Sequence, residues 1–150
     1  AMKYLSALIL PLILFSSLIE AEKVINDNDC ETKLIQMMKP QYPNTNYQGY
    51  AVIKFNINEK GTLNNTKVIK SMCVDSRSET GEIIFTKCPF FKTTSIDASR
   101  YLKYKLPLDK NGKSCSIKDH EYTFNYSLFS QDFENDGFMT RAELMKSLVN

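Results

Sequence analysis

The residues with the clearest metal-binding pattern lie near the C-terminus, where the segment 132–137 reads Asp-Phe-Glu-Asn-Asp-Gly and Glu143 follows. This order is close to the D-x-[DN]-x-[DN]-G-x₅-E pattern of an EF-hand calcium loop, which binds the ion through carboxylate and other oxygen atoms. The candidate calcium ligands are Asp132, Glu134, Asp136, Thr140 and Glu143. Glu134 is longer than the usual Asp or Asn, and the segment before the loop is a predicted strand. The alternative for 131–150 is therefore an acidic turn that leads into a terminal helix.

The cysteines form a second group with chemical potential: Cys30, Cys73, Cys88 and Cys115. None of their spacings is the C-x-x-C of a zinc site or a redox motif, so we do not expect thiol-bound metal. An even number of cysteines in an exported chain predicts disulfides, and four cysteines allow three connectivities. Pairing Cys73 with Cys88 would close one long connection, and this pairing leaves Cys30 for Cys115.

The N-terminal segment has the order of a secretory signal peptide. A short basic start at Met2-Lys3 precedes the apolar run 4–19, which ends at Glu20-Ala21. We predict a signal peptide over residues 1–21, cleavage after Ala21, and a periplasmic or secreted protein. The alternative is an uncleaved membrane anchor, but the run contains Pro11 and is shorter than the roughly 20 residues that span a bilayer.

The composition argues against two classes of function. The chain has 19 basic and 17 acidic residues and a net charge of +2, so no basic surface for nucleic acid is expected. We also predict that the protein is not an enzyme and has no catalytic residue. His120 is the only histidine, and we expect it at the surface; there is no nucleophile elbow or glycine-rich phosphate loop. Apart from the calcium hypothesis, we predict no cofactor.

The elements that would position these residues are predicted from periodicity. A β-hairpin over 50–71 is predicted because Ala51, Ile53, Phe55 and Ile57 alternate with more polar residues before a turn at 59–61. The spacing of Leu34, Met37 and Met38 predicts a helix over about 29–39.

Further along the chain, residues 72–92 are expected to be a long connection that holds two of the cysteines. Thr94 or Ser95 is the predicted N-cap of a second helix. The segment 120–130 is a predicted strand with Tyr122, Phe124, Tyr126 and Leu128 on one face. The expected fold class is thus α+β: a small, mainly three-stranded antiparallel sheet packed against two helices, plus a C-terminal helix.

The order of these segments resembles the C-terminal domain of the TonB family of periplasmic energy transducers. The residues that carry the likeness are Pro40-x-Tyr42-Pro43, Gly49–Phe55 with Asn58–Gly61, Leu102-Lys103-Tyr104-x-x-Pro107, and the closing strand Tyr122–Tyr126. The likeness covers about residues 38–130, so we assign 22–130 to a domain of this type. The chain lacks the long Pro-rich linker of family transducers, and it has Leu102-Lys103-Tyr104 where such members have Trp-Lys-Tyr.

The resemblance implies a function in protein binding. In the family, the last strand can be a sheet edge on which a short receptor segment docks as an added strand. On this chain the implied partner is an extended segment of an envelope protein or outer-membrane receptor. The implied binding residues are Tyr122, Phe124, Asn125, Tyr126 and Leu128. Pairing of two copies through the same edge, and a membrane-anchored energy transducer, are the alternatives.

Overall fold

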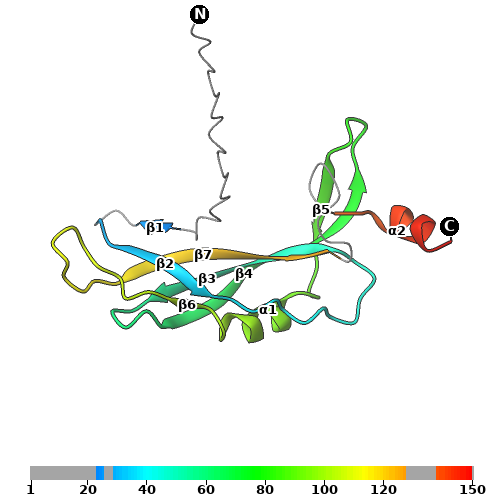
Figure 1. Cartoon of the computed structure of the whole chain (residues 1–150). Helices are drawn as coiled ribbons and strands as arrows, with labels where there is room; N and C mark the ends of the chain where they lie inside the picture. Colours follow the sequence, from blue (N-terminus) through cyan, green and yellow to red (C-terminus); the bar gives the residue numbers. More distant parts are fainter. Residues whose placement is uncertain (1–22, 26–28, 128–137, 150) are drawn as a thin grey trace, which may run out of the picture.

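A computed structural model describes residues 23–25, 29–127 and 138–149, and within these residues the chain is mostly β (Figure 1). Seven described strands form two antiparallel sheets. The larger sheet has the order β5 (Ile83–Lys87), β4 (Leu63–Arg77), β3 (Gly49–Ile57), β7 (Ile117–Tyr126). The smaller sheet has the order β1 (Lys23–Ile25), β2 (Glu31–Gln36), β6 (Lys103–Tyr104). Two short helices, α1 (Lys92–Ser99) and α2 (Arg141–Val149), complete the described part.

This architecture shows that the expected fold class was wrong. The predicted helix over 29–39 is instead the strand β2, which pairs with β1 on one side and with β6 on the other. Pairing on both sides satisfies backbone hydrogen-bonding groups of β2. The helix prediction rested on the spacing of only three apolar residues, which is a weak signal by comparison. Accordingly Met37 and Met38, which the predicted helix would have placed on its apolar stripe, are 55% and 45% exposed.

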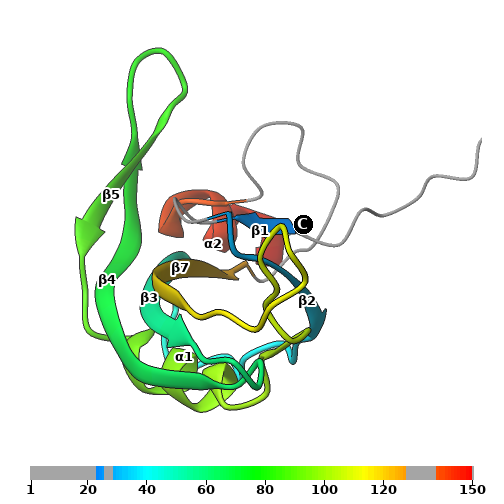
Figure 2. The same cartoon turned by 90° about the vertical axis from the view of Figure 1, so that its left-hand side faces the viewer.

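The expected connection over 72–92 is also wrong in form, because most of it is a β-hairpin arm. β4 continues to Arg77, turns at 78–82, and returns as β5. The turn is held by the N–H of Ser78, which donates to the carbonyl of Glu82 at 2.8 Å. Figure 1 shows the tip of this arm rising from one end of the larger sheet, and Figure 2 shows how β4 curves along its length.

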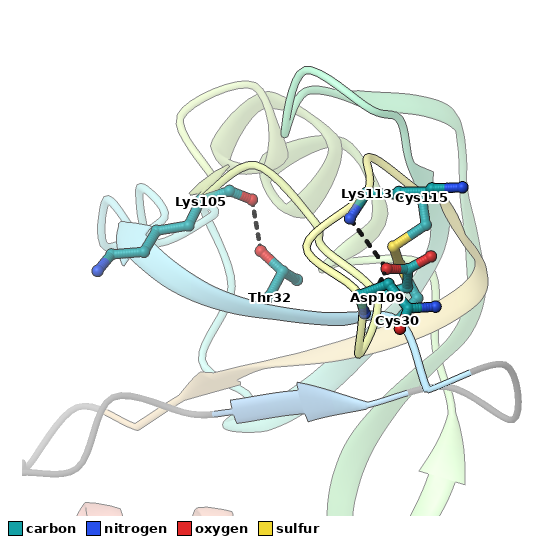
Figure 3. The surroundings of a disulfide bond; sticks show 7 residues. Cys30, Thr32, Lys105, Asp109, Lys113 and Cys115 are labelled. Atoms are coloured by element: carbon teal, nitrogen blue, oxygen red, sulfur yellow. Dashed lines mark hydrogen bonds between the residues drawn. A yellow bond between two sulfur atoms is a disulfide. The ribbon is translucent and has the colours of Figure 1, made fainter.

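Both disulfides form in the pairing favoured by the sequence. Cys73 and Cys88 are 15 residues apart and close the base of the arm, whereas Cys30 and Cys115 are 85 residues apart and join the residue just before β2 to the segment before β7. In the chain-entropy account these loops stabilise the fold by about 3 and about 4.6 kcal/mol. Figure 3 shows the second disulfide.

The surroundings of that disulfide hold the smaller sheet together. The hydroxyl of Thr32 donates to the carbonyl of Lys105, and the carboxylate of Asp109 accepts from the N–H of Lys113 at 2.9 Å (Figure 3). Leu108 and Glu31 exchange backbone hydrogen bonds of 2.9 and 3.0 Å. The chain entering β2 is therefore fixed against the segment that leads into β7.

The core lies on one face of the larger sheet. The predicted inward face of β3 is confirmed, since Ala51, Ile53, Phe55 and Ile57 are at most 1% exposed. Phe91 is fully buried beneath β7, where its ring stacks on Tyr126 with centroids 4.4 Å apart. Gly49 permits this packing, because a Cβ built there would lie 1.9 Å from the carbonyl oxygen of Met72.

The second helix starts earlier than expected. α1 begins at Lys92, its N-cap is Phe91, and no side chain caps its first turn. The two predicted caps instead bind β7: Ser95 Oγ and Thr94 Oγ1 lie 2.6 and 2.8 Å from the hydroxyl of Tyr126. Their hydroxyls attach the helix to the last strand of the sheet, which is a tertiary role that a local capping argument does not predict.

Candidate functional site

The candidate site is the outer edge of β7, the end strand of the larger sheet. Within the described residues β7 pairs with β3 alone. On one side of β3, the N–H of Val74 on β4 donates to the carbonyl of Gln48 at 2.8 Å, so Gln48 directs its carbonyl toward β4. Because successive residues of a strand direct their backbone groups to opposite sides, the next residue, Gly49, bonds toward β7.

The alternation continues along β7 and decides which of its backbone groups point outward. The bonded pairs across β3 and β7 are Gly49 with Tyr126, Ala51 with Phe124, and Ile53 with Tyr122. The residues between them, Glu121, Thr123 and Asn125, therefore direct N–H and C=O away from β3. These three residues also have exposed side chains.

The residues predicted to bind a partner thus occupy two different positions. Phe124 and Tyr126 are each 2% exposed and point into the core, whereas Asn125 is exposed and presents its backbone at the edge. Tyr122 is half-buried, and Leu128 lies outside the described residues. The aromatic side chains hold the strand in place, and the residues between them direct backbone groups out of the edge. Thr123 was not among the predicted binding residues, because the outward direction of its backbone depends on the register of β3 with β4.

An exposed apolar surface borders this edge. The hydroxyl of Tyr122 donates to the Sδ of Met37 at 3.5 Å, which places the segment after β2 beside β7. Met37 and Met38 are 55% and 45% exposed. Methionine side chains are flexible and polarizable, and they adapt to different apolar partners. The strand edge therefore has an adjacent surface for apolar side chains.

The first half of β4 is a second open edge, but it has features that discourage pairing. β5 pairs only with residues from Met72 onward, so the part of β4 before it faces β3 alone. Its register with β3 shifts twice, between Val52 and Ile53 and between Lys54 and Asn56. Lys67 and Lys70 are exposed there. Bulges and edge lysines oppose strand addition, whereas the part of β7 from Glu121 to Tyr126 has neither.

The C-terminal candidate ligands are only partly within the described residues. Asp132, Glu134 and Asp136 lie outside them. Thr140 and Glu143 form a capping box: the N–H of Thr140 donates to the Glu143 carboxylate at 2.7 Å, and the N–H of Glu143 donates to the Thr140 hydroxyl at 3.2 Å. The signal Thr140-x-x-Glu143 was readable in the sequence. No cluster of three or more metal-ligating side chains occurs among the described residues.

Glu143 also ties α2 to the hairpin arm. Its other carboxylate oxygen accepts from Nε of Arg77 at 2.6 Å, and the same guanidinium donates to the carbonyl of Phe138 at 3.0 Å. Burial tends to raise the pKa of Glu143, but the hydrogen bonds from Thr140 and Arg77 outweigh it and lower the pKa below its usual value. Both oxygens of this carboxylate thus have structural partners.

His120 has a structural environment rather than the surface position expected from the sequence. It is half-buried, and its ring meets those of Phe55 and Tyr104 edge to face at 5.4 and 5.9 Å. Such contacts are typical of aromatic packing in a core. They place the imidazole against the inner face of the sheet.

Comparison with known proteins adds no further assignment. No family model matches the chain, and no curated protein matches it at a significant level. Within the described ranges, no helix is both long enough and apolar enough to cross a membrane.

Proposed function

We propose that this chain is an exported protein-interaction module that binds an extended segment of an envelope protein as an added strand on β7. The observation that carries the proposal is the outward direction of the backbone groups of Glu121, Thr123 and Asn125. Each such residue offers one donor and one acceptor to a neighbouring strand, and hydrogen bonds of this kind supply the affinity in strand addition. The regular register of this part of β7 favours a straight partner strand.

Side chains beside the edge would supply selectivity. A partner strand alternates its side chains between the two faces of the sheet. On the core side it would meet Tyr122, Met37 and Met38, which favour apolar residues at alternate positions. On the opposite side it would meet Thr123, Asn125 and Glu121, and Glu121 lies 3.8 Å from Lys54. We therefore expect the partner segment to alternate apolar and polar residues.

Export to an oxidising compartment is part of the proposal. Two disulfides join four cysteines of the chain, and such bonds persist in oxidising compartments. The expected signal peptide over 1–21, which lies outside the described residues, agrees with export, and the resemblance to TonB C-terminal sequences suggests an envelope partner. The proposed binding by β7 does not depend on that resemblance, because it rests on the geometry of the sheet edge.

Peptide selection followed by proline substitution tests the proposal. Peptides would be selected from a display library on the disulfide-bonded protein, and their affinity measured for the parent, Asn125→Pro and Asn125→Thr. Proline removes an outward N–H without removing a bond to β3, whereas threonine keeps the N–H. We expect Asn125→Pro to weaken binding by about tenfold or more and Asn125→Thr by less than about threefold. Equal affinity for both variants would contradict strand addition.

A further inference from the structure

The outer face of the smaller sheet combines exposed aliphatic side chains with lysines. The inner face is buried, since Val24 on β1 and its cross-strand partner Thr32 on β2 are 5% and 4% exposed. Because side chains alternate along a strand, the residues that flank these two point outward. The segment after β6 continues this outer face through the bridge between Leu108 and Glu31. The aliphatic side chains of what we call the β2 face are 44% to 60% exposed: Ile25, Ile35, Leu106 and Leu108.

Lysines form a row across the β2 face. Lys23 on β1 is the direct cross-strand partner of Lys33 on β2, and the carbonyl of Lys33 accepts the N–H of Lys105 at 2.9 Å. All three side chains are exposed, and Figure 3 shows that of Lys105 extending away from the disulfide. Like charges directly opposite each other on neighbouring strands are destabilising. Anionic groups placed against this face would offset that repulsion.

The acidic groups around this row already have partners. Glu31 pairs with Lys23 at 3.0 Å, and Asp29 pairs with Lys110 at 3.0 Å. The carboxylate of Asp109 accepts two backbone N–H groups of its own turn, each at 2.9 Å. The lysines of this region that have no ion pair within the described ranges are Lys33, Lys103 and Lys105. The uncompensated charge of the β2 face is therefore positive.

The mixture of lysine and aliphatic side chains distinguishes the β2 face from a protein-binding surface. The centres of protein interfaces are depleted in lysine and enriched in aromatic residues and arginine. The outward residues named above include neither an aromatic side chain nor an arginine. At an anionic membrane surface, by contrast, lysine stems lie along apolar groups while their ammonium groups reach the lipid phosphates. The chemistry of this face thus matches a lipid surface better than a protein.

We infer that the β2 face docks the protein on an anionic lipid surface. Its aliphatic side chains enter the boundary between headgroups and acyl chains, and the lysine row meets the phosphates. A hollow of about 420 Å³, lined by Lys33, Lys105 and Leu106 among others, has room for a headgroup. The docking face belongs to the smaller sheet and the proposed strand partner binds the larger one, so the two interactions can be measured separately.

Cosedimentation with lipid vesicles tests the inference. The protein is the mature, disulfide-bonded chain that begins at Glu22 after the predicted cleavage, because the apolar run 4–19 would itself bind lipid. The vesicles are phosphatidylglycerol mixed with phosphatidylcholine, and phosphatidylcholine alone. We expect saturable binding to the anionic vesicles that is tighter by about tenfold or more than binding to the neutral ones. Absence of binding, or equal binding to both kinds of vesicle, would overturn the inference.

A pair of lysine substitutions tests the part played by charge on this face. Lys33→Gln with Lys105→Gln should weaken binding to anionic vesicles by about tenfold or more. The matched control, Lys87→Gln with Lys92→Gln, removes the same charge from exposed positions at the base of the arm and the start of α1. It should change the affinity by less than about twofold, because those lysines lie outside the docking face. Equal weakening by the two pairs would show general attraction to charge and overturn the inference.

A pair of aliphatic substitutions tests insertion into the lipid. Ile35→Gln with Leu106→Gln should weaken binding by about fivefold or more, although both side chains are exposed in the free protein. The matched control is Met145→Gln with Leu148→Gln on α2, which changes two equally exposed apolar side chains and should have little effect. Unchanged affinity of the Ile35, Leu106 variant would overturn the inference. A dimer in analytical ultracentrifugation that this variant abolishes would also overturn it, by assigning the face to a second copy.

Discussion

The hydroxyl of Tyr126 provides the most detailed test of how α1 holds β7 in place. It lies 2.6 Å from Ser95 Oγ and 2.8 Å from Thr94 Oγ1, and Ser95 is fully buried. Burial raises the pKa of Tyr126 despite these two hydrogen bonds, so the phenol stays neutral and is able to donate. Tyr126→Phe removes the hydroxyl and retains the ring that stacks on Phe91.

The expected cost of Tyr126→Phe follows from these contacts. Each lost hydrogen bond weakens the fold by about 1 kcal/mol, and a buried hydroxyl left without a partner costs about 1–3 kcal/mol. Thr94 is only half-buried and can bind water, so the full penalty applies to Ser95 alone. We expect Tyr126→Phe to lower the free energy of unfolding by about 2 kcal/mol, without the larger cost of a cavity.

Urea denaturation of a double-mutant cycle measures this effect. Ser95→Ala in the Tyr126→Phe background removes the group that was left unpaired, so the double variant should be about 1 kcal/mol more stable than the sum of the single effects predicts. The midpoint should move without a change in the slope of the transition. Additive effects, or a loss below about 0.5 kcal/mol for Tyr126→Phe, would refute the proposed bond between helix and strand.

Three other substitutions test separate parts of the fold. Burial raises the pKa of Glu143, but hydrogen bonds from Thr140 and Arg77 lower it by more, so the pKa is below its usual value. The docking of α2 should therefore be intact above about pH 4.5 and be lost as the pH falls through the lowered value; Glu143→Gln should remove this dependence in NMR spectra of α2. Gly49→Ala should destabilise by about 3 kcal/mol or more in urea, because its Cβ would meet the carbonyl of Met72. Burial raises the pKa of Tyr42 to about 12, so stability should fall between about pH 10 and 12, and Tyr42→Phe should flatten that fall.

Each of these three has an outcome that contradicts its reasoning. An unchanged acid profile in Glu143→Gln would mean that α2 docks without the ion pair. A fully stable Gly49→Ala would mean that β3 and β4 can separate at that position without cost. A steep alkaline fall that persists in Tyr42→Phe would assign it to other groups, among which Tyr126 also has a raised pKa.

The parts of the fold that the sequence predicted correctly are those with one-sided burial. β3 alternates strictly between the core and the other face of the sheet, so a period of two identified both the strand and its inward residues. β7 has the same alternation at Phe124 and Tyr126. The pairing of Cys73 with Cys88 was also predicted correctly, because both cysteines lie in the same connection between predicted elements.

The parts that sequence analysis missed depend on contacts between distant residues. β2 is a strand because β1 and β6 pair with it, and β6 lies about 70 residues further along the chain. In β5, Ile83 and Phe85 are half-buried and Ile84 is exposed, but all three residues are apolar, so the sequence shows no alternation that would identify a strand. The outward direction of Asn125 follows from the register of β3 with β4, which local periodicity does not specify.

The most direct test of binding by β7 is amide hydrogen exchange, measured by NMR with and without a selected peptide. In the free protein the amide of Phe124, which bonds to β3, should exchange slowly, whereas the amides of Thr123 and Asn125 should exchange quickly. Bound peptide should slow Thr123 and Asn125 by about tenfold or more and leave Phe124 nearly unchanged. Peptide binding without protection of Thr123 and Asn125 would contradict the proposed strand addition.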